Sequence, residues 1–127
     1  MRRLSLLLSI FVVAAVGNAA SLSPAARAEI DSLLSRLEAS TCTFIRNGTS
    51  YPAAEAKSHL LLKLKYLEDR GAVETAEQFI ERAASSSSTT GRPYLVKCGS
   101  GAPVQSGTWL RSQLQLVRSS GRAGNAP

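Results

Sequence analysis

This 127-residue sequence has few of the residues that build common metal sites. It has one histidine and two cysteines, and neither cysteine belongs to a C-x-x-C pair or lies near the histidine. A zinc site draws three or four ligands from such side chains, so we expect no metal and no cofactor. The basic residues form no recognition helix or nucleic-acid motif, so we expect no nucleic-acid partner.

Long hydrophobic runs are missing after the first twenty residues. At the N-terminus, the positive start MRR precedes an apolar segment from Leu4 to Val16, and the small residues GNA follow. Crossing a bilayer takes about 20 apolar residues, so this shorter run is typical of a secretory signal peptide. We expect cleavage after Ala19 or Ala20. The mature protein is then expected in the periplasm or outside the cell, with no membrane span.

Acidic residues are missing from the last third of the chain. All nine Asp and Glu residues lie between Glu29 and Glu81, whereas residues 82–127 carry six Lys or Arg and no acid. Such asymmetry suggests a face that attracts anions. The alternative is scattered, solvated positive charge without a partner, because six charges are spread over 46 residues.

Start and stop signals predict four helices. Ser-Pro and Pro residues open the first two, a T-x-x-Q capping box opens the third, and a glycine ends the second. The predicted ranges are 23–39, 52–69, a short helix that follows the capping box at 75–78, and a helix that starts near 106.

Three short segments have the β-branched and aromatic composition of strands. Residues 42–46 and 49–51 flank Asn47-Gly48, a typical type I′ hairpin turn, and a third strand is expected over 93–98. Residues 99–103 are expected to form a turn or linker. The predicted fold class is α+β, with four helices packed on a small antiparallel sheet in the order α-β-β-α-α-β-α.

Domain organisation follows from length and composition. Residues 1–20 are expected to be the signal peptide, 21–118 a single globular domain, and 119–127, rich in Gly, Ser and Ala, a disordered tail. We expect a monomer or a weak oligomer.

Cys42 and Cys98 are expected to form a disulfide, because an even pair in an exported chain meets an oxidising compartment. Closing a loop of roughly 57 residues stabilises a domain by about 4 kcal/mol in the chain-entropy model. The bond would place the strand over 93–98 beside the strand over 42–46.

Several short motifs resemble a known family. They include FIRNG at 44–48, TAEQFI at 75–80 and GRPY at 91–94. In these motifs and their order, the chain is similar to the YfeK-like family of small exported bacterial proteins, over roughly residues 42–98. The resemblance implies a location in the cell envelope. The family has no assigned activity, so it supplies no catalytic residues.

One helix face carries the candidate catalytic residues. Glu55, His59 and Lys63 follow one another at intervals of four, so their side chains meet on one side of the second helix. A carboxylate that orients an imidazole is typical of a general base, and a serine of the 85–90 loop could then serve as nucleophile. The alternative is a solvated helix face with weak ion pairs.

A cationic and aromatic patch is the other candidate. Six residues carry it and are the predicted binding residues: Arg46, Asn47, Tyr51, Lys63, Arg92 and Tyr94. Cations beside aromatic rings and hydroxyls suit an anionic or glycan component of the envelope, whereas core packing is the alternative for the tyrosines.

The favoured function is therefore a non-catalytic module that binds an anionic or glycan envelope component. A small hydrolase that uses Glu55 and His59 as an acid–base pair is the alternative. Leu61 and Leu62 fall outside the core stripe of the second helix. If these two leucines are exposed, a structural or assembly role gains support.

Overall fold

The computed structural model describes residue 12 and residues 21–124, so the expected signal peptide lies, apart from residue 12, outside the described residues. The α+β fold class is confirmed, in the order α-β-β-α-α-β-β-α. The elements are α1 (Pro24–Ala39), β1 (Thr43–Arg46), β2 (Thr49–Pro52), α2 (Ala53–Glu68), α3 (Ala76–Ala83), β3 (Leu95–Lys97), β4 (Val104–Gln105) and α4 (Ser106–Gly124).

Side-chain caps hold two of the predicted helix starts, those of α1 and α3, whereas α2 begins after Pro52 without one. The hydroxyl of Ser23 accepts a hydrogen bond from the backbone N–H of Ala26 at 3.1 Å, ahead of α1. At α3, the hydroxyl of Thr75 accepts from the N–H of Gln78 at 3.1 Å. The Gln78 side chain accepts from Glu74 at 2.7 Å, one residue earlier than the capping box predicts. Both caps satisfy backbone donors that a helix start would otherwise leave unpaired.

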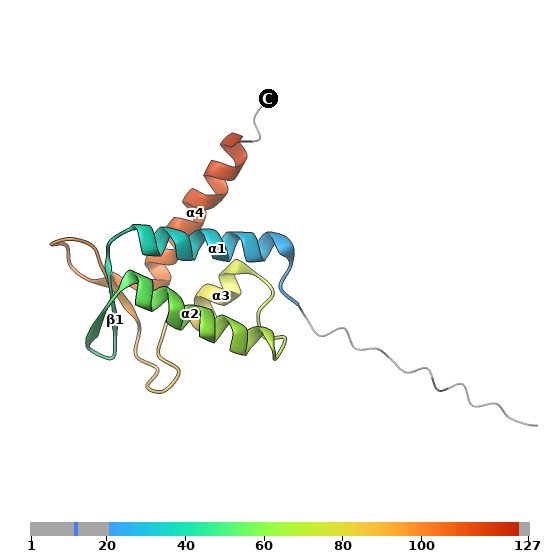
Figure 1. The fold of residues 1–127 in the computed structure, drawn as a ribbon, viewed down its shortest axis with the longest axis horizontal. Helices are drawn as coiled ribbons and strands as arrows, with labels where there is room; N and C mark the ends of the chain where they lie inside the picture. The colour runs from blue at the N-terminus through green and yellow to red at the C-terminus, as the bar shows by residue number, and fades with distance from the viewer. Residues whose placement is uncertain (1–11, 13–20, 125–127) are drawn as a thin grey trace, which may run out of the picture.

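All four strands form one antiparallel sheet in the order β2-β1-β3-β4. The hairpin turn between β1 and β2 has positive φ at both central residues, 49° at Asn47 and 79° at Gly48, as a type I′ turn requires. The helices lie to one side of this sheet, with α1 and α2 next to each other and α4 running away from the sheet (Figure 1).

The predicted disulfide is confirmed. Thr43 is paired with Lys97 in the β1–β3 ladder, so the next residue outward on each strand is a cysteine. Cys42 and Cys98 are bonded, with their Cα atoms 4.3 Å apart. The bond joins β1 to β3 at the end of the ladder, and it is consistent with a location outside the cytoplasm.

Strand β4 was missed by the sequence analysis, which expects only a turn or linker before α4. Val104 pairs with Val96 and Gln105 with Leu95. A two-residue strand directly after Pro103 shows no alternation that a pattern could reveal. Its formation depends on the partner strand β3.

Helix α4 is longer than expected. It continues to Gly124, so residues 119–124, which were assigned to a disordered tail, are helical in the structure. The buried first turns anchor the helix, and each further residue then adds one hydrogen bond without a new nucleation cost. Residues 125–127 lie outside the described part of the chain.

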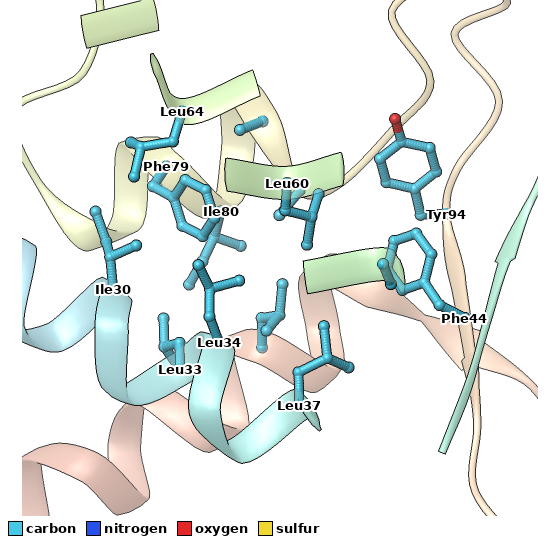
Figure 2. Close-up of a cluster of buried hydrophobic side chains, with 14 of the residues drawn as sticks. Ile30, Leu33, Leu34, Leu37, Phe44, Leu60, Leu64, Phe79, Ile80 and Tyr94 are labelled. Carbon is cyan, nitrogen blue, oxygen red and sulfur yellow. The ribbon is translucent and has the colours of Figure 1, made fainter. Parts of the chain in front are cut away.

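A single hydrophobic core lies among the four helices and the sheet (Figure 2). Helices α1 and α2 contribute leucines at helical spacing. Trp109 is only partly buried against this core. The largest fully buried side chains are Tyr94, Phe44, Phe79, Ile30, Leu33, Leu34, Leu37, Leu60, Ile80, Leu110, Val73 and Val96.

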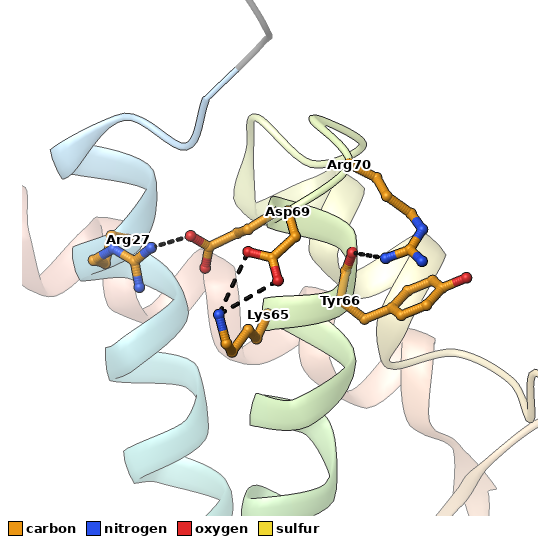
Figure 3. A network of polar contacts seen from close by, with 6 residues as sticks. Arg27, Lys65, Tyr66, Asp69 and Arg70 are labelled. Carbon is orange, nitrogen blue, oxygen red and sulfur yellow. Dashed lines mark hydrogen bonds and ion pairs between the residues drawn. The ribbon is translucent and has the colours of Figure 1, made fainter.

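Ion pairs tie the helices together at the surface. The guanidinium of Arg118 on α4 binds Glu29 on α1 with two hydrogen bonds, of 2.7 and 3.2 Å, and lies 2.5 Å from Glu77 on α3. At the C-terminal end of α2, Arg27 pairs with Glu68 (Figure 3). Part of the basic charge of residues 82–127 is thus paired within the fold.

Among the described helices, none is both long enough and apolar enough to cross a membrane.

Candidate functional site

Tyr94 lies at the centre of the candidate site, immediately before β3. Its ring packs against Phe44 of β1, with 5.0 Å between the ring centroids, and the residue is only 1% exposed. In Figure 2 the hydroxyl group points away from Phe44. The ring is therefore part of the core, as the alternative for the tyrosines proposes, while its hydroxyl is available to polar neighbours.

Two basic side chains of α2 reach this hydroxyl. Lys63 Nζ donates a hydrogen bond to it at 3.0 Å and another to the carbonyl of Ser86 at 2.9 Å. His59 Nε2 lies 3.3 Å from the same hydroxyl oxygen. Because His59 and Lys63 are four residues apart on one helix, a single tyrosine can contact both.

Arg46 brings a third basic group from the end of β1. Its Nε is buried and has no hydrogen-bond partner among the described residues. A buried donor without a partner costs about 1–3 kcal/mol, and more when the group is charged. We define Arg46, His59 and Lys63 as the cationic cluster.

The pKa values show the strain within the cationic cluster. Burial, followed by the charge of Arg46, lowers the pKa of Lys63 from 10.5 to about 8. Burial, Arg46 and Lys63 all lower the pKa of His59 below its usual 6.5. Burial also raises the pKa of Tyr94, although Arg46 beside it acts in the opposite direction. Burial and the neighbouring charge of Arg46 therefore both disfavour the protonated forms of Lys63 and His59.

A small cavity of about 110 Å³ opens beside the cationic cluster. Its walls come from β1, β2 and the first turns of α2, and they include the predicted residues of both hypotheses. The lining residues are Phe44, Arg46, Tyr51, Glu55, Ala56 and His59. Because a water molecule takes up about 30 Å³ in the liquid, this cavity holds one small polar or charged group.

A second, wider cavity lies on the other side of His59. It has a volume of about 400 Å³, and its walls are largely apolar. It is lined by His59, Leu62, Lys63, Tyr66, Leu67, Arg82 and Ser88. His59 lines both cavities, so the two spaces share one wall.

The hydrolase arrangement lacks two of its contacts. Among the described residues, no hydrogen bond or ion pair joins Glu55 to His59, and none joins His59 to a serine hydroxyl. The hydroxyl of Ser85 donates to the carbonyl of Ile80 at 2.6 Å. The hydroxyl of Ser87 is bound by Asn47. Of the serines that the structure describes, Ser88 lines the second cavity together with His59.

Three predicted binding residues line neither cavity: Asn47, Arg92 and Tyr94, whose hydroxyl is bound by Lys63. Asn47 Nδ2 donates to the Ser87 hydroxyl at 3.1 Å, and its Oδ1 accepts from the Thr90 hydroxyl at 2.7 Å. The side chain of Asn47 therefore joins the hairpin to the loop at residues 85–90, which we call the serine-rich loop. Arg92, two residues after that loop, is exposed and lines neither cavity.

Sequence analysis did not identify the apolar wall of the second cavity. Leu62 and Tyr66 are 70% and 56% exposed, and both face this cavity. The sequence contained a partial indication of this wall, because Leu61 and Leu62 fall outside the core stripe of the second helix. Leu61 is 40% exposed. Arg82 was counted only as a basic residue.

Within the described residues, no three His, Cys, Asp or Glu side chains gather as a metal site would require.

Comparison with known proteins places the chain in a family without an assigned role. The family of unknown function DUF5329 matches residues 24–118, so the chain belongs to it. The uncharacterized protein YfeK of Salmonella typhimurium is 48% identical over 68 residues, which cover 53% of this chain and 55% of that protein. The chain thus spans about half the length of this curated relative, and the resemblance to the YfeK-like family is confirmed. No solved structure gives a significant match.

Proposed function

We propose that this protein is a non-catalytic module of the cell envelope that binds an anionic component through the cationic cluster. The observation that carries the proposal is the buried Nε of Arg46, which has no partner among the described residues. Arg46 also lines the first cavity, where its guanidinium could pair with an anion. The negative charge of that anion would also favour the protonated forms of Lys63 and His59, whose pKa values burial and, after it, the charge of Arg46 lower.

The size of the first cavity favours one charged group over a sugar ring. At about 110 Å³ it lies well below the 300–1,000 Å³ that is typical of pockets for whole small molecules. A carboxylate, sulfate or phosphate group matches this space and the planar guanidinium of Arg46. Among the described residues that line the cavity there is one acid, Glu55, whose charge Arg46 faces across the same space. An anionic group of an envelope component is therefore favoured over a neutral glycan.

Titration of the purified exported protein with inorganic phosphate tests this function. We expect binding in the millimolar range by calorimetry, and binding at least tenfold weaker for Arg46→Met. Arg92→Met is the matched control, because it removes an exposed basic residue outside both cavities. Equal phosphate affinity in the Arg46→Met variant and the natural protein would contradict the proposal.

A small hydrolase is the second candidate, since Ser88 and His59 line the same cavity. A lowered pKa keeps the imidazole of His59 neutral near pH 7, as a general base requires. Its test is hydrolysis of ester and phosphoester substrates by the natural protein and by His59→Gln. Turnover that disappears in His59→Gln would favour the enzyme, and no turnover in the natural protein would remove this candidate.

A further inference from the structure

The second cavity follows α2 over the two turns that come after His59. From His59 to Leu67 the helix rises about 12 Å, at about 1.5 Å per residue. Arg82 of α3 and Ser88 of the serine-rich loop form the remaining wall. The space is therefore a groove of about 400 Å³ that starts at the cationic cluster and runs toward the end of α2.

Exposed apolar side chains form much of this groove. Leu62 is 70% exposed and Tyr66 is 56% exposed, and they lie four residues apart on the same helix face. Arg70 holds the ring of Tyr66 in place. Its guanidinium carbon lies 3.5 Å from the ring centroid, and its Nη1 donates to the Tyr66 carbonyl at 3.1 Å (Figure 3). One wall of the groove is thus an aromatic ring already ordered by a neighbour.

Two basic side chains, Lys63 and Arg82, line the groove. Lys63 lies beside His59, where the groove adjoins the first cavity, and Arg82 lines the wall contributed by α3, with its Nη1 bound to the Ala72 carbonyl at 2.5 Å. No acidic residue is among the described residues that line the groove. An occupant with an apolar body and a negative charge is therefore complementary to this surface.

We propose that the ligand of the cationic cluster is an amphiphilic anion with a single hydrocarbon chain of medium length. Its anionic group would occupy the cavity at Arg46 and His59, and its chain would lie along Leu62 and Tyr66. This inference rests on the proposed anion binding and deepens it, because it specifies what is attached to the charged group.

The division of space between the two cavities supports an amphiphile. The first has room for one small group such as a carboxylate or a phosphate, and the second is nearly four times larger and mainly apolar. A glycan would need polar partners along its length, which the wall at Leu62, Tyr66 and Leu67 does not offer. A hydrocarbon chain gains from leaving water and needs no hydrogen bond.

A chain-length series tests the inference with defined probes. Acetate, hexanoate and decanoate share a carboxylate, and decanol has the same chain as decanoate without the charge. A fully buried CH₂ group raises affinity by about fourfold, so an open groove should give about twofold per CH₂ group. We expect decanoate to bind at least tenfold more tightly than acetate or decanol, measured below the concentration at which micelles form.

Substitutions then test separately where the hydrocarbon chain and the charged group of the probe bind. Leu62→Gln is expected to reduce the ratio of decanoate to acetate affinity by about fivefold. Leu116→Gln is the matched control, because Leu116 is an exposed leucine of α4 outside both cavities, and it should leave that ratio unchanged. Arg46→Met is expected to weaken binding of every carboxylate in the series.

Three outcomes overturn the inference and are distinguishable from one another. If decanoate and acetate bind equally, and Arg46→Met weakens both, the amphiphile is wrong while the anion site stands. If neither carboxylate nor phosphate binds the natural protein, the proposed function is wrong and the inference falls with it. A Leu62→Gln variant that alters self-association but not the affinity ratio would instead assign the apolar surface to a protein interface.

Discussion

Lys63 and Tyr94 are joined by two different interactions. Lys63 Nζ donates to the Tyr94 hydroxyl at 3.0 Å and lies 4.8 Å from the centroid of the same ring. Tyr94 is anchored in the core, and Lys63 is fixed to the loop through Ser86. The charge of Lys63 is therefore held in one place on rigid elements, as a binding site requires.

The first prediction concerns stability against pH. The pKa of Lys63 is about 8 in the folded protein and near 10.5 in an unfolded chain. Between these values the unfolded state binds more protons at this residue, so the free energy of unfolding should rise with pH. The pKa of Tyr94 is raised above 10.0 and acts in the opposite sense at higher pH. The rise is therefore expected between pH 8 and 10.

Urea unfolding at several pH values measures this rise. His59, whose pKa is lowered, stays neutral throughout this window, so it does not obscure the effect. In Lys63→Met the rise between pH 8 and 10 should be absent. An equal rise in the variant and the natural protein would show that other groups cause it.

The second prediction concerns anion affinity against pH. A bound anion favours protonated Lys63, so affinity for phosphate or a carboxylate should be highest below pH 8 and fall above it. The loss of one charge-assisted hydrogen bond corresponds to about tenfold or more in affinity. Acetate suits this measurement by calorimetry, because its own charge is constant over this range. Affinity that does not change up to pH 10 would exclude Lys63 from the site.

The third prediction separates two contributions of Asn47 to stability, its side-chain hydrogen bonds and its tolerance of a positive φ. Asn47→Gly keeps the positive φ of 49° available but removes both side-chain hydrogen bonds to the serine-rich loop, for a loss of about 1–3 kcal/mol. Asn47→Ala should cost about 1 kcal/mol more, because an L side chain is strained at this φ. Unfolding free energies from urea titration provide the comparison. Equal stability of the glycine and alanine variants would show that backbone strain is unimportant here.

The fourth prediction concerns the disulfide. Replacing Cys42 and Cys98, which are 56 residues apart, with alanine should lower the free energy of unfolding by about 4 kcal/mol. The register between β1 and β3 should survive, because backbone pairing continues from Thr43 to Ile45. Equilibrium unfolding measures the loss, and hydrogen exchange at Ile45 and Val96 reports the register. A loss below about 1 kcal/mol would show that the bond does not constrain the unfolded chain.

Local signals in the sequence predicted most of the fold. Helix caps such as Ser23, the hairpin turn at Asn47-Gly48 and the paired cysteines each depend on a few neighbouring residues or on the compartment. Strand β4 and the last turns of α4 depend instead on contacts made in the folded protein. The ion pairs of Arg118 with α1 and α3 also arise only there. The excess of basic residues over 82–127 therefore did not predict a free cationic face, because Arg118 is paired with acids of α1 and α3.

The candidate site was only partly predictable for the same reason. Helical spacing placed His59 and Lys63 on one face, and the structure brings both to Tyr94. No sequence pattern could show that Tyr94 would be buried with its hydroxyl between them. The missing partner of Arg46 Nε is likewise a property of tertiary packing. Asn47 was expected to bind a ligand, yet its side chain is bonded to the serine-rich loop.

The central claim is that the cationic cluster lowers the free energy of unfolding when no anion is bound, and that a bound anion restores it. Its most direct test is the unfolding free energy of the natural protein and of Arg46→Met, each with and without phosphate. Methionine keeps the apolar part of the side chain and removes the unpaired donor. Without phosphate, we expect Arg46→Met to be more stable than the natural protein by about 1 kcal/mol. Phosphate should stabilise the natural protein and leave the variant unchanged, whereas a less stable variant that phosphate still stabilises would contradict the account.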